Sequence, residues 1–166
     1  MAYQKILVGI DGSKQSDEAL QKAIAVAKQN QAELYLLSVV NEAHHIIATQ
    51  SSFDLVDRDV MYDRAVEEMQ KILAEKQAVA KKAGIQTVHT EVRKGLAKVE
   101  LADKYPHEKG IDLIVIGASG LNAIGRLIVG STATYVIRVA PCDVTVVKTD
   151  LDNQPLKIKE SSRPEI

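Results

Sequence analysis

Glycine and serine residues between positions 117 and 131 form the part of this sequence best suited to bind an anion. Gly117 and Gly120 follow an apolar run, and Gly130 and Ser131 open a stretch of helical spacing. Glycine lets the backbone adopt positive φ values and approach a ligand without an intervening Cβ atom. The free N–H groups at a helix start favour phosphate. The spacing thus indicates a phosphate site built from backbone amides.

The same residues also have a purely structural interpretation. In this interpretation the three glycines have the sole role of shaping turns, and Ser131 acts as the N-cap of the helix that follows. Alternatively, the Ser131 hydroxyl donates a hydrogen bond to a phosphate oxygen. The residue types and their spacing leave both interpretations open.

Established motifs for nucleotide binding and hydrolysis are missing from the sequence. There is no G-x-x-x-x-G-K-[ST] segment, hence no lysine placed to reach a γ-phosphate, and no G-x-G-x-x-G after the first apolar run. Residues 117–121 look like a nucleophile elbow, but Leu121 stands where G-x-S-x-G requires glycine. His44 and His45 are adjacent, so they point in different directions, and no carboxylate-rich spacing accompanies them. We therefore predict neither serine hydrolase chemistry nor a metal site.

Alternating apolar and amphipathic segments must position these residues. We predict strands at 5–10, 33–40, 86–92, 111–116 and 143–148, and helices at 16–30, 55–83, 96–105 and 131–139. The first, second and fourth runs are almost wholly apolar, as in strands buried on both faces, whereas 86–92 alternates and belongs nearer a sheet edge. This order predicts a parallel sheet with helices on both faces. Ligands of such sheets bind beyond the carboxyl ends of the strands.

Length and composition predict one globular domain with a short tail. The chain has 166 residues, of which 46% are hydrophobic and 26% charged, and its formal net charge is −1. We assign residues 1–148 to the domain and expect the polar segment 149–166 to be disordered. The balanced charge gives no general attraction to nucleic acid or to a membrane, and no apolar run approaches the length of a membrane span. The lone Cys142 and the absence of a signal peptide favour the cytoplasm.

Several segments, in this order, resemble the universal stress protein family. Gly117, Gly120, Gly130 and Ser131 match the family spacing G-x2-G-x9-G-[ST]. The other similar segments are 6–13, 36–40, 112–117 and 139–147. Together they extend the resemblance over residues 3 to 148. It implies a five-stranded parallel sheet of order 3-2-1-4-5, of the adenine-nucleotide α-hydrolase-like type.

In members with this glycine pattern, the resemblance also implies ATP binding. Asp11 and the backbone of Val39 would hold the adenine. The residues that would line the pocket or surround the ribose and phosphates are Gly9, Ile10, Ile116, Gly117, Ser119, Gly120, Gly130, Ser131 and Thr132. Mg²⁺ bound through the phosphates is compatible with such a site. The loop 41–54 is long enough to act as a lid over a nucleotide.

The resemblance implies a non-catalytic, nucleotide-responsive homodimer of the stress response, at most a slow ATPase, with a downstream protein partner that the sequence does not identify. Dimerisation would use the last strand, 143–148. Two departures stand out. Ser119 occupies a position where many members have a basic residue, and Asp143 one where proline is common. The alternatives are a nucleotide-free dimeric adaptor, or an ATP-hydrolysing or nucleotidyl-transferring enzyme, which would need basic and histidine motifs that are absent here.

Overall fold

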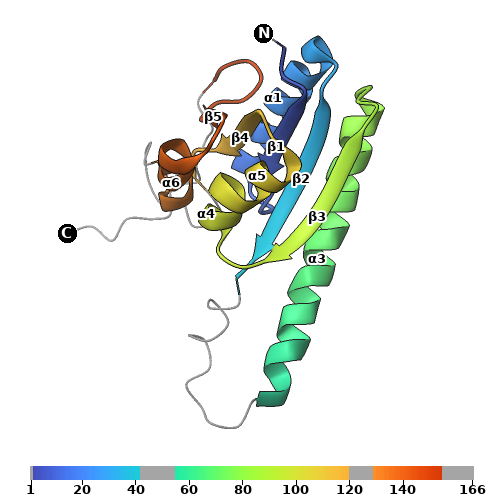
Figure 1. Ribbon diagram of the computed structural model, residues 1–166. Helices are drawn as coiled ribbons and strands as arrows, with labels where there is room; N and C mark the ends of the chain where they lie inside the picture. Colours follow the sequence, from blue (N-terminus) through green and yellow to red (C-terminus); the bar gives the residue numbers. More distant parts are fainter. Residues whose placement is uncertain (1, 42–54, 120–128, 155–166) are drawn as a thin grey trace, which may run out of the picture.

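A five-stranded parallel sheet forms the centre of the molecule (Figure 1). The computed structural model describes residues 2–41, 55–119 and 129–154, with only the backbone of residues 55–59. The strands are β1 (Lys5–Gly9), β2 (Glu33–Val40), β3 (Val88–Lys94), β4 (Leu113–Gly117) and β5 (Asp143–Val147), in the order β3-β2-β1-β4-β5. The predicted order 3-2-1-4-5 is therefore confirmed. β3 is at an edge, as its alternating pattern predicted.

Helices cover both faces of the sheet, as predicted. They are α1 (Lys14–Asn30), α3 (Leu55–Lys82), α4 (Ala97–Val99), the π-helical turn η1 (Glu100–Lys104), α5 (Tyr105–Lys109) and α6 (Ser131–Val139). On one face, Ile6 and Val8 pack with apolar residues of α1 and α3. On the other face, Leu7 packs with residues of η1, α5 and α6. Successive residues of β1 thus enter different cores, because side chains alternate across a strand.

The helix predicted over 96–105 continues to Lys109, so the predicted end at residue 105 is wrong. The Tyr105 N–H donates to the carbonyl of Glu100, five residues earlier, which makes a wide π turn just before the proline. A proline in a regular helix clashes with the carbonyl of the preceding turn. The wider turn places Pro106 at the beginning of a new helical segment, where proline is tolerated.

The N-cap of α1 is Ser13. The Ser16 N–H donates to the Ser13 hydroxyl oxygen at 3.1 Å, and the Ser16 hydroxyl donates to the Ser13 carbonyl at 2.8 Å. After β5, residues 149–154 lie against α1, where the Lys22 ammonium donates to the Thr149 hydroxyl at 2.8 Å. Residues 155–166 of the predicted tail lie outside the described part of the chain.

Candidate functional site

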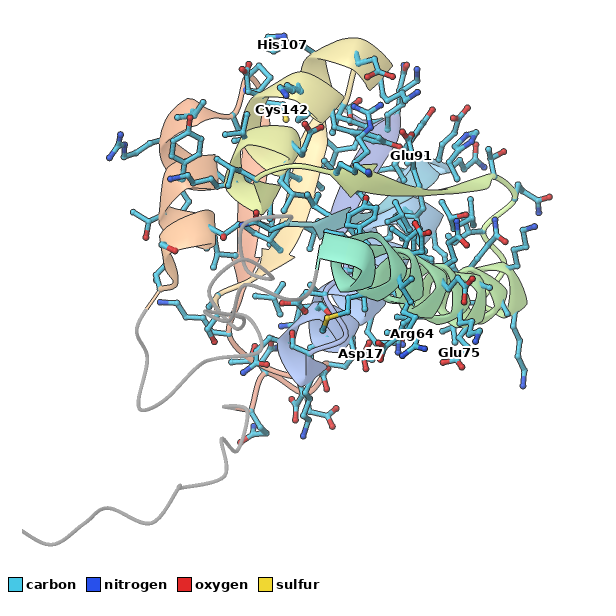
Figure 2. The ribbon with its side chains drawn as sticks, turned by 90° about the horizontal axis from the view of Figure 1, so that it is seen from below. Asp17, Arg64, Glu75, Glu91, His107 and Cys142 are labelled. Atoms are coloured by element: carbon cyan, nitrogen blue, oxygen red, sulfur yellow. The ribbon has the colours of Figure 1, made fainter. Side chains whose placement is uncertain are left out.

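The predicted site residues come from segments that meet at the carboxyl ends of the strands. Gly9 ends β1, Val39 is the penultimate residue of β2, Gly117 ends β4 and Ser131 begins α6. Ile10 and Asp11 are the two residues that follow β1. Ile116, Ser119 and Thr132 lie within two residues of Gly117 or Ser131 in the sequence. The arrowheads in Figure 1 show β2 and β3 ending at the lower side of the molecule. Figure 2 views the fold from that side, and the first-turn residue Asp17 of α1 is labelled there.

A tight turn fixes Asp11 beyond the end of β1. Its Oδ1 atom accepts a hydrogen bond from the Ser13 N–H at 2.9 Å. Gly12 has a φ of +81°, a conformation that favours glycine. Ile10 is held on both sides, because its N–H donates to the Leu37 carbonyl and its carbonyl accepts from the Ser38 hydroxyl at 2.6 Å. The turn thus holds the Asp11 carboxylate in place and leaves Oδ2 to accept from a ribose hydroxyl or an adenine amine.

The backbone of Val39 faces the space beyond β1. The Leu37 carbonyl accepts from Ile10 at 2.9 Å, so Leu37 directs its backbone groups toward β1. Backbone groups alternate along a strand, and those of Val39 therefore point to the same side as those of Leu37. β1 ends at Gly9, opposite Leu37. The N–H and C=O of Val39 consequently extend past the end of β1, the arrangement needed to recognise the edge of a purine base.

The first turn of α6 presents the backbone groups expected to hold phosphate. The N-cap is Gly130, so Ser131 is the first helical residue and is not the N-cap. The Gly130 N–H donates to the Ala118 carbonyl at 2.7 Å and joins the helix start to the segment after β4. The N–H groups of Ser131 and Thr132 belong to the first turn and have no acceptor within the helix. The Ser131 hydroxyl is exposed beside them.

Two glycines of the predicted motif lack the positive φ value that a turn glycine is expected to have. Neither Gly117 nor Gly130 adopts one. Gly117 lies so close to α1 that a Cβ atom there would be 2.8 Å from the Gln15 Cβ and 3.0 Å from its carbonyl carbon. At Gly130 the nearest atom would be the Ala118 carbonyl oxygen, at 3.4 Å. Packing of the fold thus accounts for Gly117, whereas a Cβ atom at Gly130 would make only ordinary van der Waals contacts with the described residues. Gly120 and the proposed lid, from residue 42 onward, lie outside the described residues.

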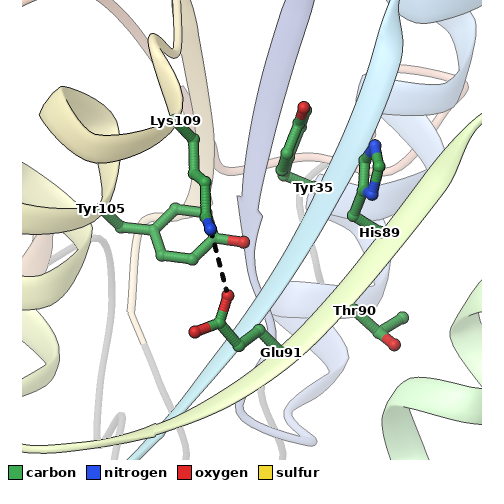
Figure 3. A pocket seen from close by; sticks show the side chains of 6 residues that line it. All are labelled: Tyr35, His89, Thr90, Glu91, Tyr105 and Lys109. Atoms are coloured by element: carbon green, nitrogen blue, oxygen red, sulfur yellow. Dashed lines mark ion pairs between the residues drawn. The ribbon is translucent and has the colours of Figure 1, made fainter.

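A separate pocket of about 300 Å³ opens beside the first half of β3 (Figure 3). Its lining residues are Tyr35, His89, Thr90, Glu91, Tyr105 and Lys109. The Tyr35 hydroxyl donates to Glu33 at 2.9 Å and its ring stacks on His89 at 4.4 Å between centroids. Burial and the nearby Glu33 carboxylate raise the pKa of Tyr35 to about 12. Sequence reasoning missed this pocket because its walls come from distant segments. Tyr35 and His89 both bond to Glu33, which lies outside the lining.

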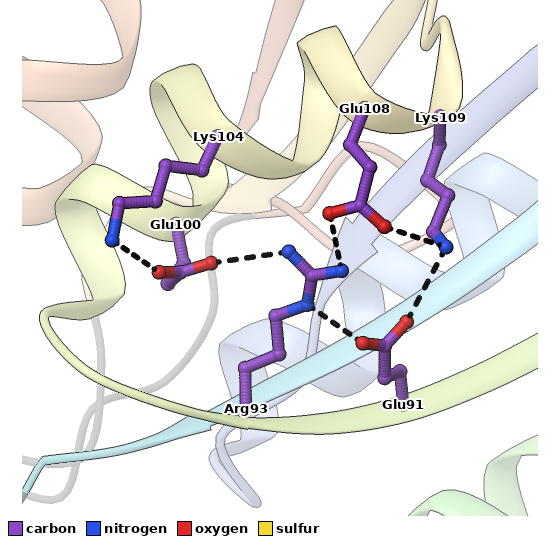
Figure 4. A network of polar contacts seen from close by, with 6 residues as sticks. All are labelled: Glu91, Arg93, Glu100, Lys104, Glu108 and Lys109. Atoms are coloured by element: carbon purple, nitrogen blue, oxygen red, sulfur yellow. Dashed lines mark hydrogen bonds and ion pairs between the residues drawn. The ribbon is translucent and has the colours of Figure 1, made fainter.

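Charged residues between β3 and α5 form a second feature that the sequence did not indicate (Figure 4). Arg93 contacts Glu91 at 2.7 Å, Glu108 at 2.6 Å and the buried Glu100 at 3.4 Å. Burial acts to lower the Arg93 pKa, but hydrogen bonds from Arg93 to Glu91 and Glu108 outweigh it and the net shift is upward. Lys104 also contacts Glu100, at 3.1 Å. This network joins the edge strand to the π turn.

Cys142 lies just before β5 and is half-buried. Burial, with smaller contributions from Asp112 and Asp143, raises the pKa of its thiol to about 11. A thiol with such a pKa carries little thiolate near neutral pH and reacts slowly. This environment agrees with a packing role for Cys142. Among the described residues, no three histidine, cysteine or acidic side chains are grouped to hold a metal ion, and no helix is long and apolar enough to cross a membrane.

Comparison with known proteins agrees with these observations. The model of the universal stress protein family matches residues 2–148. A universal stress protein of Staphylococcus haemolyticus is 36% identical over 166 residues, which cover 100% of this chain and 93% of the relative. The solved structure of the universal stress protein UspA from Lactobacillus plantarum superposes with a TM-score of 0.79 at 30% identity, over 89% of this chain and 99% of the other.

A further solved structure is a universal stress protein in complex with cAMP. It has a TM-score of 0.64 and 26% identity, and it covers 89% of this chain and 98% of its own. One assignment follows from the order of the strands, the segments at their carboxyl ends and these matches over nearly the whole chain. This chain belongs to the universal stress protein family.

Proposed function

We propose that this protein binds an adenine nucleotide, with ATP as the expected ligand, beyond the carboxyl ends of β1, β2 and β4. The observation that carries this proposal is the convergence of three kinds of group at one end of the sheet. They are the Asp11 carboxylate, the outward-facing backbone of Val39 and the first-turn N–H groups of α6. The first two suit a nucleoside and the third suits phosphate. The relative solved with cAMP supports the same ligand class.

The proposed role is a nucleotide-responsive component of the stress response in the cytoplasm, without rapid turnover. Phosphoryl transfer needs cations and a positioned base around the γ-phosphate. The described residues expected around the phosphates are Gly117, Ser119, Gly130, Ser131 and Thr132, which are uncharged. Mg²⁺ would enter bound to the phosphates and would neutralise part of their charge. The protein would then act by reporting nucleotide occupancy to a partner.

Titration calorimetry with ATP and Mg²⁺ tests the proposal. We expect the unaltered protein to bind, and Gly130→Val to lower the affinity at least about tenfold, since the branched side chain would enter the phosphate site at the helix start. Thr134→Val, an exposed position on the same helix, is the matched control and should bind as the unaltered protein does. Thermal unfolding checks that each variant is folded. Sustained release of ADP or AMP would favour the enzyme alternative instead.

The nucleotide-free adaptor is the second candidate, and one observation favours it. Gly117 is explained by its contact with α1 alone, so this glycine needs no ligand to account for it. The same calorimetry separates the two candidates. If the folded, unaltered protein shows no heat of binding with ATP, the adaptor becomes the better proposal.

We also propose that two copies pair through β5. This strand is at the edge of the sheet and bonds only with β4 among the described strands. Val144 and Val146 are half-buried, while Ile137 of the adjacent α6 is 53% exposed. Sedimentation velocity should show a dimer at micromolar concentration, and Val146→Lys should shift it to monomer, because two like charges would face each other across the paired edges. A monomeric unaltered protein would contradict this proposal.

A further inference from the structure

The proposed nucleotide site needs a positive charge that its predicted residues do not supply. The phosphates of ATP carry several negative charges, and backbone N–H groups neutralise them only in part. The described residues expected around the phosphates are glycines and hydroxyl-bearing residues. Among the described residues, a cation that completes the site must therefore come from another element, and this inference rests on the nucleotide binding proposed above.

Lys98 lies near the carboxyl end of β1. Leu101 packs closely on Gly9, the last residue of β1, where a Cβ atom would be 3.2 Å from both Leu101 methyl carbons. Lys98 precedes Leu101 by three residues on the same helical segment, so both project from the same face and Lys98 is one turn nearer the helix start. This places Lys98 further out than Leu101, at the rim of the proposed site.

The ammonium group of Lys98 also lies beside α6. Its Nζ atom is 5.4 Å from the centre of the Tyr135 ring, a distance at which the ring face attracts a cation. Tyr135 follows Thr132 by three residues and Ser131 by four, so it continues the side of α6 that begins at the proposed phosphate site. Figure 1 shows α4 and α6 next to each other at this end of the molecule.

Lys98 differs from Lys104 and Lys109 of its helical segment in having no acidic partner among the described residues. Lys104 contacts Glu100 at 3.1 Å and Lys109 contacts Glu108 at 2.8 Å. Lys98 is exposed, and within the described ranges 2–41, 55–119 and 129–154 no carboxylate forms an ion pair with it. No carboxylate of the described residues therefore competes with an anion for this charge.

We propose that Lys98 is the phosphate-binding cation of this site and determines its preference for nucleotides with more phosphates. Tyr135 positions the ammonium group beside the first turn of α6, from which the flexible side chain reaches the distal phosphates. Adenosine, which has no phosphate, would bind without help from Lys98. Selection among ATP, ADP and AMP would then depend mainly on this one charge.

Titration calorimetry of ATP, AMP and adenosine, each with Mg²⁺, tests this role. We expect Lys98→Met to weaken ATP binding about five- to tenfold, AMP binding less, and adenosine binding not at all. Lys98→Arg should restore most of the ATP affinity. Lys28→Met, which removes one exposed charge from the last turn of α1, is the matched control and should have no effect. Added salt should weaken ATP binding more in the unaltered protein than in Lys98→Met.

The outcomes separate this inference from the function on which it rests. Unchanged ATP affinity in Lys98→Met would overturn the role of Lys98 and leave nucleotide binding in place. An equal loss for adenosine and ATP would overturn it as well, because the residue would then act through the structure rather than through phosphate charge. A folded, unaltered protein that binds none of the three ligands would overturn both proposals.

Discussion

Gly117→Ala is expected to destabilise the protein by about 2–3 kcal/mol, since its new methyl group has no space. The Cβ atom would be 2.8 Å from the Gln15 Cβ and 3.0–3.1 Å from the Gln15 carbonyl group. The carbonyl group is helix backbone, so the first turn of α1 would have to move away from the sheet. That movement would also disturb the Asp11 turn, which leads into α1. Chemical denaturation measures the loss, and calorimetry with ATP should show weaker binding.

Gly130→Ala is the matched control for this prediction. Both glycines belong to the same sequence motif, but Gly130 has a φ of −64° and its nearest neighbour would be 3.4 Å from an added Cβ atom. Alanine is a weaker N-cap than glycine, so we expect a loss below about 1 kcal/mol. Equal stability of the two variants would show that α1 accommodates the methyl group and that close packing does not explain Gly117.

Arg93→Met is expected to lower the free energy of unfolding by about 2–3 kcal/mol. The side chain of Glu100 is 5% exposed and would lose one of its two cationic partners, and an incompletely paired buried charge is costly. Arg93 also holds Glu91 and Glu108, and its guanidinium lies 4.5 Å from the centre of the Tyr105 ring. Urea denaturation of the variant measures the effect.

Two further variants isolate the cause of that loss. Lys104→Ala removes the other partner of Glu100, but the Lys104 side chain is 62% exposed, so its contribution should be below about 1 kcal/mol. Adding Glu100→Gln to Arg93→Met removes the buried charge and should recover part of the stability, because the two effects are coupled. If the double variant lost the full sum of both single effects, the buried carboxylate would not be the reason.

Much of the fold follows from local patterns in the sequence. Apolar runs rich in β-branched residues predicted the buried strands, and the spacing of apolar residues predicted α1, α3 and α6. These patterns reflect whether one or both sides of an element are buried, so they can be read without knowing what the element packs against. Their alternation predicted the parallel sheet, and the resemblance to a family predicted its order, which the structure confirms. The failure at Pro106 is also local, because the π turn that accommodates the proline leaves no pattern in the residues.

By itself, then, the sequence determined the order of the elements and placed Asp11, Val39, Gly117 and Ser131 at the carboxyl ends of the strands. The tertiary structure decided what their neighbours are. It showed that Gly117 is needed for contact with Gln15, that Arg93 pairs with the buried Glu100, and that Lys98 lies over Tyr135. Each of these contacts joins side chains from different elements. Their distances depend on how helices pack on the sheet, and no periodicity along the chain encodes that packing.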